Sequence, residues 1–256
     1  MSAQPRQRPR SLIELHYQVD DRFRMIGALA QDPNFRRDVH DIFNLIALVP
    51  IVVLNAMNWR WELLIDNQWT VPSDLWHGQS FELFWWSTLA YFIVDLLWVV
   101  SVSGSVRSPS VIVVHHCITL VYLMVPRLHP SLGWCMGACM SVELNTWFLI
   151  ARRIFNKSGI NPFMPSGELG EIAGMKIKAT SIGFYLTWIP IRLVLYPSLV
   201  IPFLREYMTT SEELGTWLNP VMLAPIFQII LTVLNLKWSL DLVRSKLKGK
   251  GPEKGL

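Results

Sequence analysis

Charged residues are scarce in this sequence. Asp, Glu, Lys and Arg make up 16% of its 256 residues, whereas a soluble globular domain carries roughly 25%. Hydrophobic residues reach 52%, and the mean hydropathy is +0.33. This balance argues against a soluble domain and predicts a polytopic membrane protein whose length suits one domain.

Cysteine is scarce as well. The three cysteines at positions 117, 135 and 139 are too few for a disulfide framework. All three lie in apolar runs, where cysteine usually acts as a small hydrophobic residue. No secretory signal peptide is expected, because the first long apolar run begins near Asp41, too late for a cleaved signal. We expect that run to be an uncleaved anchor.

Six apolar runs approach the roughly 20 residues that a helix needs to cross a bilayer. The expected spans are 41–57, 81–103, 110–127, 131–151, 180–203 and 217–243. They predict an all-α fold, a polytopic membrane helical bundle of about six transmembrane helices. The expected domains are a partly disordered N-terminal tail at 1–39, a membrane domain at 40–245 and a basic tail at 246–256.

The placement of Lys and Arg predicts how the bundle is oriented. If both termini share one side, that side holds 18 basic residues, and the other side holds Arg60, Arg127 and Arg205. An excess of Lys and Arg marks the cytosolic side. We therefore expect both termini in the cytosol and an even number of spans.

Five expected spans place strongly polar residues at one depth, just cytosolic of the bilayer midplane, when helices rise 1.5 Å per residue. They are Asp95, His115 with His116, Glu143, Arg192 and Asn235. Ionisable groups are costly inside a bilayer and face the bundle interior or a cavity. The layer predicts a lined pocket. The alternative is a structural cluster in which Arg192 pairs with Asp95 or Glu143.

The two adjacent histidines differ by 100° around a helix, so only one can face the bundle centre. Thr119 is one turn from both, and its hydroxyl could orient either ring. Histidine can act as a general base or a nucleophile near neutral pH. In the fifth span, Trp188 and Arg192 have the i, i+4 spacing of a cation–π contact, and Pro190 between them predicts a kink or local opening.

This ordered set of residues resembles the TLC domain, a six-span family that includes the ceramide synthases. The matching stretches are Tyr91-Phe92-Ile93-Val94-Asp95, His115-His116-x-x-Thr119, Glu143-Leu144-Asn145-Thr146-Trp147-Phe148 with Arg152, Trp188-x-x-x-Arg192, and Asn235-x-x-Trp238. The resemblance covers about residues 40–245. It implies residence in the endoplasmic reticulum or, for some members, the plasma membrane.

The resemblance does not extend to the full ceramide synthase pattern. Those enzymes transfer an acyl chain from acyl-CoA to a sphingoid amine, and their paired histidines are implicated in the transfer. They also carry a motif of the form HD-x-x-D-x-x-x-E-x-x-K, whereas this chain has MSVELNTWFLIARRI. The chain is more similar to the shorter TLC domain-containing proteins, although Trp147 replaces their usual proline. Those proteins are tied to membrane lipid homeostasis.

Three functions stay open. The first is a protein that binds or senses a lipid or acyl chain and affects membrane lipid composition or homeostasis. The second is an acyltransferase with acyl-CoA as co-substrate, in which His115 or His116 is the catalytic base or acyl acceptor, and Arg152, Arg153 and Lys157 attract the CoA phosphates. The third is a proton-coupled lipid or small-molecule transporter. The expected lipid-binding or substrate-binding residues are Asp95, Thr119, Glu143, Thr146, Trp188, Arg192 and Asn235.

The expected partners are membrane lipids and, for the acyltransferase, acyl-CoA. No nucleic acid or cofactor is expected. No metal is expected either, because the polar residues offer no His, Asp or Glu pair at the i, i+4 spacing of a helical metal site. The sequence predicts no oligomeric state.

Overall fold

The computed structural model describes residues 32–68, 70–156 and 169–248. Most of the expected tail at 1–39 and of the basic tail at 246–256 therefore lies outside the described residues. Within the described part, every regular element is a helix. The α-helices are α2 (Pro33–Met57), α3 (Trp61–Ile65), α4 (Phe81–Ser101), α5 (Pro109–Tyr122), α6 (Met124–Leu128), α7 (Gly133–Met140), α8 (Val142–Asn156), α9 (Leu169–Thr187), α10 (Tyr196–Ser198), α11 (Val200–Leu214) and α12 (Leu223–Lys248). The π-helix η3 (Trp188–Leu195) and the short 3-10 turns η1 (Pro72–Leu75), η2 (Pro130–Leu132) and η4 (Pro220–Met222) complete the fold.

Five stretches of the described residues are long and apolar enough to cross a membrane. They are Pro33–Met57, Phe81–Ser101, Pro109–Leu128, Gly174–Leu214 and Pro220–Arg244. In the most apolar part of each stretch, at most 39% of the residues are buried, and many large apolar side chains point outward, as helices that face lipid require. The predicted all-α polytopic bundle is confirmed.

The fourth expected span, 131–151, corresponds to α7 and α8, which are separated only at Ser141. The Ser141 N–H still donates to the Gly137 carbonyl at 3.1 Å, so the two helices form one nearly continuous rod. This rod runs antiparallel to α2. Asn55 donates to the Gly137 carbonyl at 2.9 Å, and Asp41 pairs with Arg153 at the other end of the rod. The two contacts lie about 20 Å apart along α2, so the rod is nearly long enough to cross the membrane.

The first span begins earlier than expected. Asp32 caps α2 by accepting a hydrogen bond from the Asn34 N–H at 2.9 Å, and Pro33 occupies the first turn, as both residue types favour. The expected start at Asp41 was too late because the first two turns are polar and escape a search for apolar runs. The expected boundary at residue 40 thus falls inside α2.

The fifth span is a long helical path with a π-helical segment in its middle. Pro190 has no N–H to donate, and its ring clashes with the carbonyl four residues before it. The regular α-helical ladder therefore ends at Thr187, and η3 takes its place until Leu195. π-helical turns are rare and are often found at functional sites. The expected disturbance at Pro190 is present as this widened turn.

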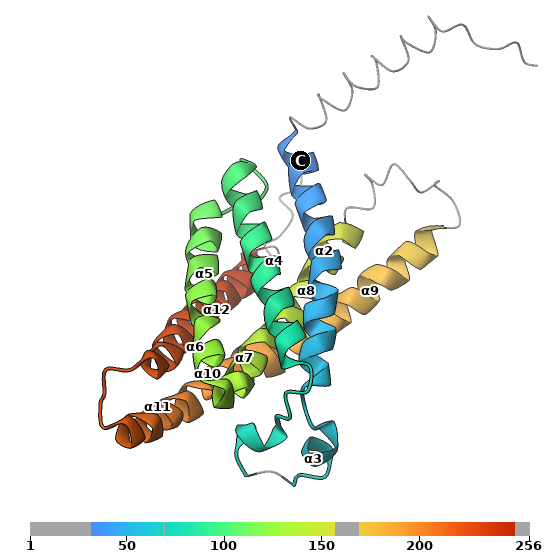
Figure 1. Cartoon of the computed structure of the whole chain (residues 1–256). Coiled ribbons are helices and arrows are strands. Elements are labelled where there is room, and N and C mark those ends of the chain that lie inside the picture. The colour runs from blue at the N-terminus through green and yellow to red at the C-terminus, as the bar shows by residue number, and fades with distance from the viewer. Residues whose placement is uncertain (1–31, 69, 157–168, 249–256) are drawn as a thin grey trace, which may run out of the picture.

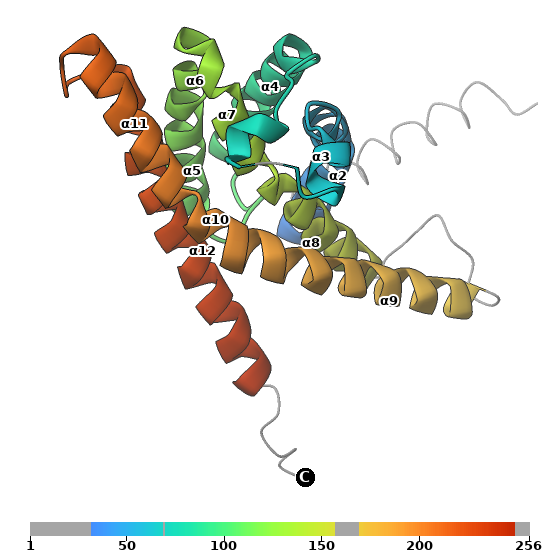
Figure 2. The same ribbon diagram turned by 90° about the horizontal axis from the view of Figure 1, so that it is seen from below.

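The helices are arranged around one interior. Figure 1 shows α2, α4 and α5 running roughly parallel, with α9 and α12 crossing them obliquely. Contacts between elements link α5 to α4, α4 to α2, α2 to α8 and α8 to α9. Figure 2 shows α11 alongside the first part of α12, which in turn contacts α5 and η3. This order leaves a space between α2, α4, α5, α8, η3 and α12.

Candidate functional site

A cavity of about 520 Å³ lies between these six helices, within the roughly 300–1,000 Å³ range of small-molecule sites. Its lining includes eight of the nine expected site residues: Asp95, His115, His116, Glu143, Thr146, Trp188, Arg192 and Asn235. Thr119 does not line the cavity. Its hydroxyl donates to the backbone carbonyl of His115 at 2.9 Å. Thr119 therefore orients neither histidine ring.

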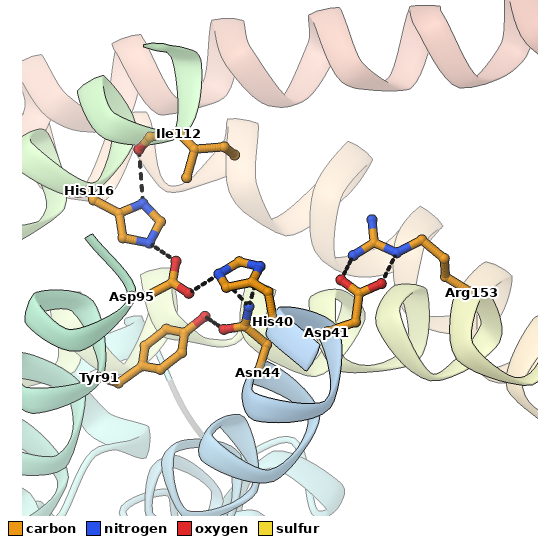
Figure 3. Close-up of polar contacts among 8 residues, drawn as sticks. All are labelled: His40, Asp41, Asn44, Tyr91, Asp95, Ile112, His116 and Arg153. Carbon is orange, nitrogen blue, oxygen red and sulfur yellow. Dashed lines mark hydrogen bonds and ion pairs between the residues drawn. The ribbon is translucent and has the colours of Figure 1, made fainter. Parts of the chain in front are cut away.

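Asp95 on α4 lies between two histidines (Figure 3). Its Oδ1 is 2.7 Å from Nε2 of His40 on α2, and its Oδ2 is 2.7 Å from Nε2 of His116 on α5. The contact to His116 is close but lacks hydrogen-bond alignment. None of the three residues is more than 5% exposed. On α2, Asn44 contacts the His40 ring and accepts a hydrogen bond from the Tyr91 hydroxyl at 2.8 Å.

His116 is held from both sides of its ring. Nδ1 of His116 lies 2.9 Å from the carbonyl oxygen of Ile112, which only accepts, so Nδ1 is the donor of this hydrogen bond. Nε2 faces the Asp95 carboxylate. The backbone of α5 and the carboxylate of α4 therefore fix the orientation of this ring.

His115 lines the cavity beside His116. Its neighbours are the rings of Phe92, Trp238 and His116, with centroids 6.3, 6.0 and 5.5 Å away. Its buried Nδ1 has no hydrogen-bond partner among the described residues. Only His116 is held by a carboxylate. His115 is thus the histidine of the pair that no charged side chain in the described part of the chain engages.

Arg192 of η3 enters the cavity wall from the side of α8 and α12. Its Nε donates to Asn145 Oδ1 at 2.5 Å, its Nη2 donates to Thr146 Oγ1 at 2.9 Å, and its Nη1 donates to Asn235 Oδ1. Asn145 is itself anchored, since it donates to the Phe184 carbonyl at 2.9 Å. All three acceptors are neutral, so they orient the guanidinium without cancelling its charge.

The alternative pairing of Arg192 with Asp95 or Glu143 is not formed as a direct ion pair. Asp95 contacts the histidines instead. Glu143 is 5% exposed and forms no ion pair within 4 Å among the described residues, although it acts on Arg192 electrostatically. Arg192 and Glu143 therefore both line the cavity wall without forming a salt bridge.

The expected cation–π contact between Trp188 and Arg192 is not found among the described ring contacts. Trp188 stacks on Phe184 at 6.1 Å and donates to Ser239 Oγ at 3.2 Å instead. The expectation was wrong because the guanidinium of Arg192 is held by its three side-chain acceptors on α8 and α12.

The basic residues at the end of α8 are already engaged. Arg153 binds the buried Asp41 with two nitrogens, Nε at 2.6 Å, as Figure 3 shows. Arg152 lies 5.6 Å from the ring centroids of both Phe184 and Tyr185. Lys157, the third member of the expected CoA-attracting set, lies outside the described residues. The contacts of both described arginines are thus within the protein.

Sequence reasoning missed His40 and Asn44, which complete the network around Asp95. His40 precedes the expected start of the first span, so it was not considered a membrane residue. The N-cap signal at Asp32 and Pro33 could have moved that start and placed His40 on the helix. No three His, Cys, Asp or Glu side chains in the described ranges are arranged to hold a metal ion.

The protein is thus a helical membrane bundle with a histidine pair, a carboxylate and an arginine around one central cavity. A family model described as the TLC domain matches residues 37–244, most of the chain. The protein therefore belongs to the TLC domain family. No curated protein and no solved structure gives a significant match.

Proposed function

We propose that this protein binds or senses a lipid whose acyl chain lies in the central cavity, and that it thereby affects membrane lipid composition or homeostasis. The observation that carries the proposal is the cavity, which combines apolar walls such as Phe92 and Ile112 with the polar groups described above. An amphipathic ligand requires both kinds of surface. We further propose the endoplasmic reticulum as its membrane, as the family resemblance implies.

The proposal is tested by the lipid content of the purified protein. Ile112→Trp adds a large ring to the cavity wall and is expected to reduce the amount of co-purified lipid several-fold. Val114→Trp is the matched control, because Val114 lies on the same helix but is 55% exposed on the outside and does not line the cavity. Equal lipid content in the wild type and both variants would contradict the proposal.

An acyl-CoA-dependent acyltransferase is the second candidate function. The free Nδ1 of His115 favours it, because a general base or acyl acceptor needs an unoccupied nitrogen. The acceptor amine or hydroxyl would attack the acyl carbonyl carbon while His115 takes its proton. The new C–N or C–O bond would form as the thioester C–S bond breaks, and the CoA thiolate would leave with the proton returned by His115.

Radiolabelled acyl-CoA and a mixture of lipid acceptors test this second candidate. Wild-type protein is expected to release a labelled acyl product, and His115→Ala is expected to abolish it. Cys117→Ala is the control, since Cys117 is exposed and on the same helix. The absence of any labelled lipid or labelled protein with the wild type would exclude acyl transfer from the mixture tested.

A further inference from the structure

The cavity continues from the histidines to the end of the bundle where α2 begins and α4 connects to α5. Arg37 of α2 and Arg107 of that connection line this outer part. The two acidic residues among the described lining residues, Asp95 and Glu143, lie deeper on α4 and α8. The outer part of the cavity therefore has an excess of positive charge.

Two buried polar atoms in this outer part have no partner. Ser105 lines the cavity and is 1% exposed, and its Oγ has no hydrogen-bond partner among the described residues. Nε of Arg37 is also buried and has no hydrogen-bond partner among the described residues. Buried polar groups in folded proteins are nearly always hydrogen-bonded. The described residues therefore leave the hydrogen-bonding capacity of these two groups unused.

Helix α5 begins at the same place. Its N-cap residue, Ser108, and Val111 of its first turn line the cavity, and no side chain caps the N–H groups that follow Pro109. The free N–H groups and the dipole at a helix start favour a bound anion. Arg36 holds the start of α2 against the connection by donating to the Ser103 carbonyl at 3.0 Å. Arg37, the connection and the start of α5 thus form one continuous wall.

We propose that Arg37, Arg107, Ser105 and the start of α5 bind the phosphate of a glycerophospholipid whose acyl chain occupies the deeper cavity. Arginine is the preferred partner of phosphate, because its planar fork donates two parallel hydrogen bonds. This inference rests on the proposed lipid binding and adds the chemical class of the ligand. Arg153 does not contribute, because Asp41 already holds its guanidinium.

The depth of the cavity favours a phospholipid over acyl-CoA. From Ser108 to His115, α5 advances about 10 Å, which an extended covalent chain covers in about eight bonds at roughly 1.3 Å per bond. In a glycerophospholipid, about five or six such bonds separate phosphorus from the acyl carbonyl carbon. In acyl-CoA, the pantetheine arm makes the separation about 14 bonds. A phosphate at the outer site therefore leaves a glycerolipid ester about 3 Å short of the depth of His115, whereas a pantetheine arm would have to fold back to end there.

The test measures binding of two radiolabelled single-chain lipids to the full-length purified protein in detergent. The probes are lysophosphatidic acid and the monoacylglycerol with the same chain, which differ only in the phosphate. Lysophosphatidic acid is expected to bind at least about tenfold more tightly than monoacylglycerol, as one charge-assisted contact provides. Arg107→Gln and Ser105→Ala are expected to reduce that preference at least about threefold, without changing monoacylglycerol binding.

Arg205→Gln is the matched control, because Arg205 is exposed on α11 and does not line the cavity. Arg107 is also exposed, so its replacement leaves the packing of the bundle intact. Equal binding of the two lipids, unchanged by Arg107→Gln, would overturn the phosphate site but leave lipid binding in place. Binding of neither lipid would contradict the proposed function as well.

Two competitors identify the source of the phosphate. The phospholipid assignment would be overturned if acyl-CoA displaced the labelled lipid more strongly than unlabelled lysophosphatidic acid does, and if this displacement depended on Arg107. Inorganic phosphate that competes as well as the lipid would assign the site to a free anion and would overturn it too. Weak competition by both is the result that supports a phospholipid.

Discussion

At the scale of single residues, the bundle depends most on Asp95, whose carboxylate joins α2 and α5 through His40 and His116. Asp95→Asn removes the charge and leaves one histidine facing an amide N–H₂ group. Removing one partner of a buried charge pair costs about 3–5 kcal/mol. We expect the free energy of unfolding to fall by roughly that amount in SDS titrations of the purified protein.

Asp241→Asn is the matched control for Asp95→Asn. Asp241 forms an exposed i, i+4 pair with Lys237 at 2.9 Å, and such pairs contribute at most about 1 kcal/mol. The control is therefore expected to unfold within about 0.5 kcal/mol of the wild type. Similar losses for the two variants would show that the Asp95 contacts do not stabilise the fold.

Arg192 gives a prediction about geometry rather than charge. Its guanidinium donates to Asn145, Thr146 and Asn235 from three different nitrogens, which a lysine ammonium on a flexible stem cannot reproduce. Arg192→Lys is expected to lower the free energy of unfolding by about 1–3 kcal/mol, as lost buried hydrogen bonds do. Thermal unfolding measures this loss, and a wild-type midpoint for Arg192→Lys would contradict the three-way contact.

The sequence located these polar residues better than it identified their partners. Position along an apolar run places Asp95, Glu143 and Arg192 at similar depths, since a helix rises by a constant amount. The contacts between these side chains depend on how each helix is rotated about its axis. They also join residues far apart in the sequence, such as His40 and Asp95, which are 55 positions apart. Thr119 shows the limit, because its hydroxyl bonds its own helix.

At the scale of the elements, the close approach of α7 to the 58–80 connection requires glycine. A Cβ atom on Gly137 would lie 2.3 Å from Trp76 Cζ3 and 2.9 Å from Trp59 Cζ2, and the two indoles pack edge to face at 5.0 Å. Gly137→Ala is expected to cost about 1–3 kcal/mol, as overpacking does, in SDS unfolding titrations.

Gly174→Ala serves as the control for Gly137→Ala. Gly174 is also helical, but nothing lies within 4 Å of a Cβ atom there. The alanine is therefore expected to stabilise α9 by up to about 1 kcal/mol. If both variants lost stability equally, the contact of Gly137 with the indoles would not be the cause.

Continuous apolar helices could be predicted from the sequence, and interrupted ones only in part. The span 81–103 and α4, Phe81–Ser101, nearly coincide, because an apolar run with polar ends marks both limits. Pro190 predicted a kink or local opening of the fifth span, but not the change to a π-helix after Thr187. At Gly133 and Gly137, the closely packed side chain of Trp76 belongs to a connection rather than to another span.

At the scale of the whole molecule, the role of α7 and α8 decides the topology. The described part of the chain has five long apolar helical stretches, which alone would leave the termini on opposite sides of the membrane. The rod formed by α7 and α8 extends from the Trp76 end of the bundle to the end where α2 begins. If this rod is the sixth crossing, both termini lie on one side, together with Arg37 and Arg107 of the outer cavity.

Protease protection in sealed microsomes tests this topology. Epitope tags at the two termini are both expected to be digested without detergent, because 18 of the basic residues then lie in the cytosol against three on the other side, as the positive-inside rule requires. A tag inserted after Asp66, in the exposed 58–80 connection, is expected to be digested only after permeabilisation. Protection of one terminal tag would show that α7 and α8 do not cross, and would place the termini on opposite sides.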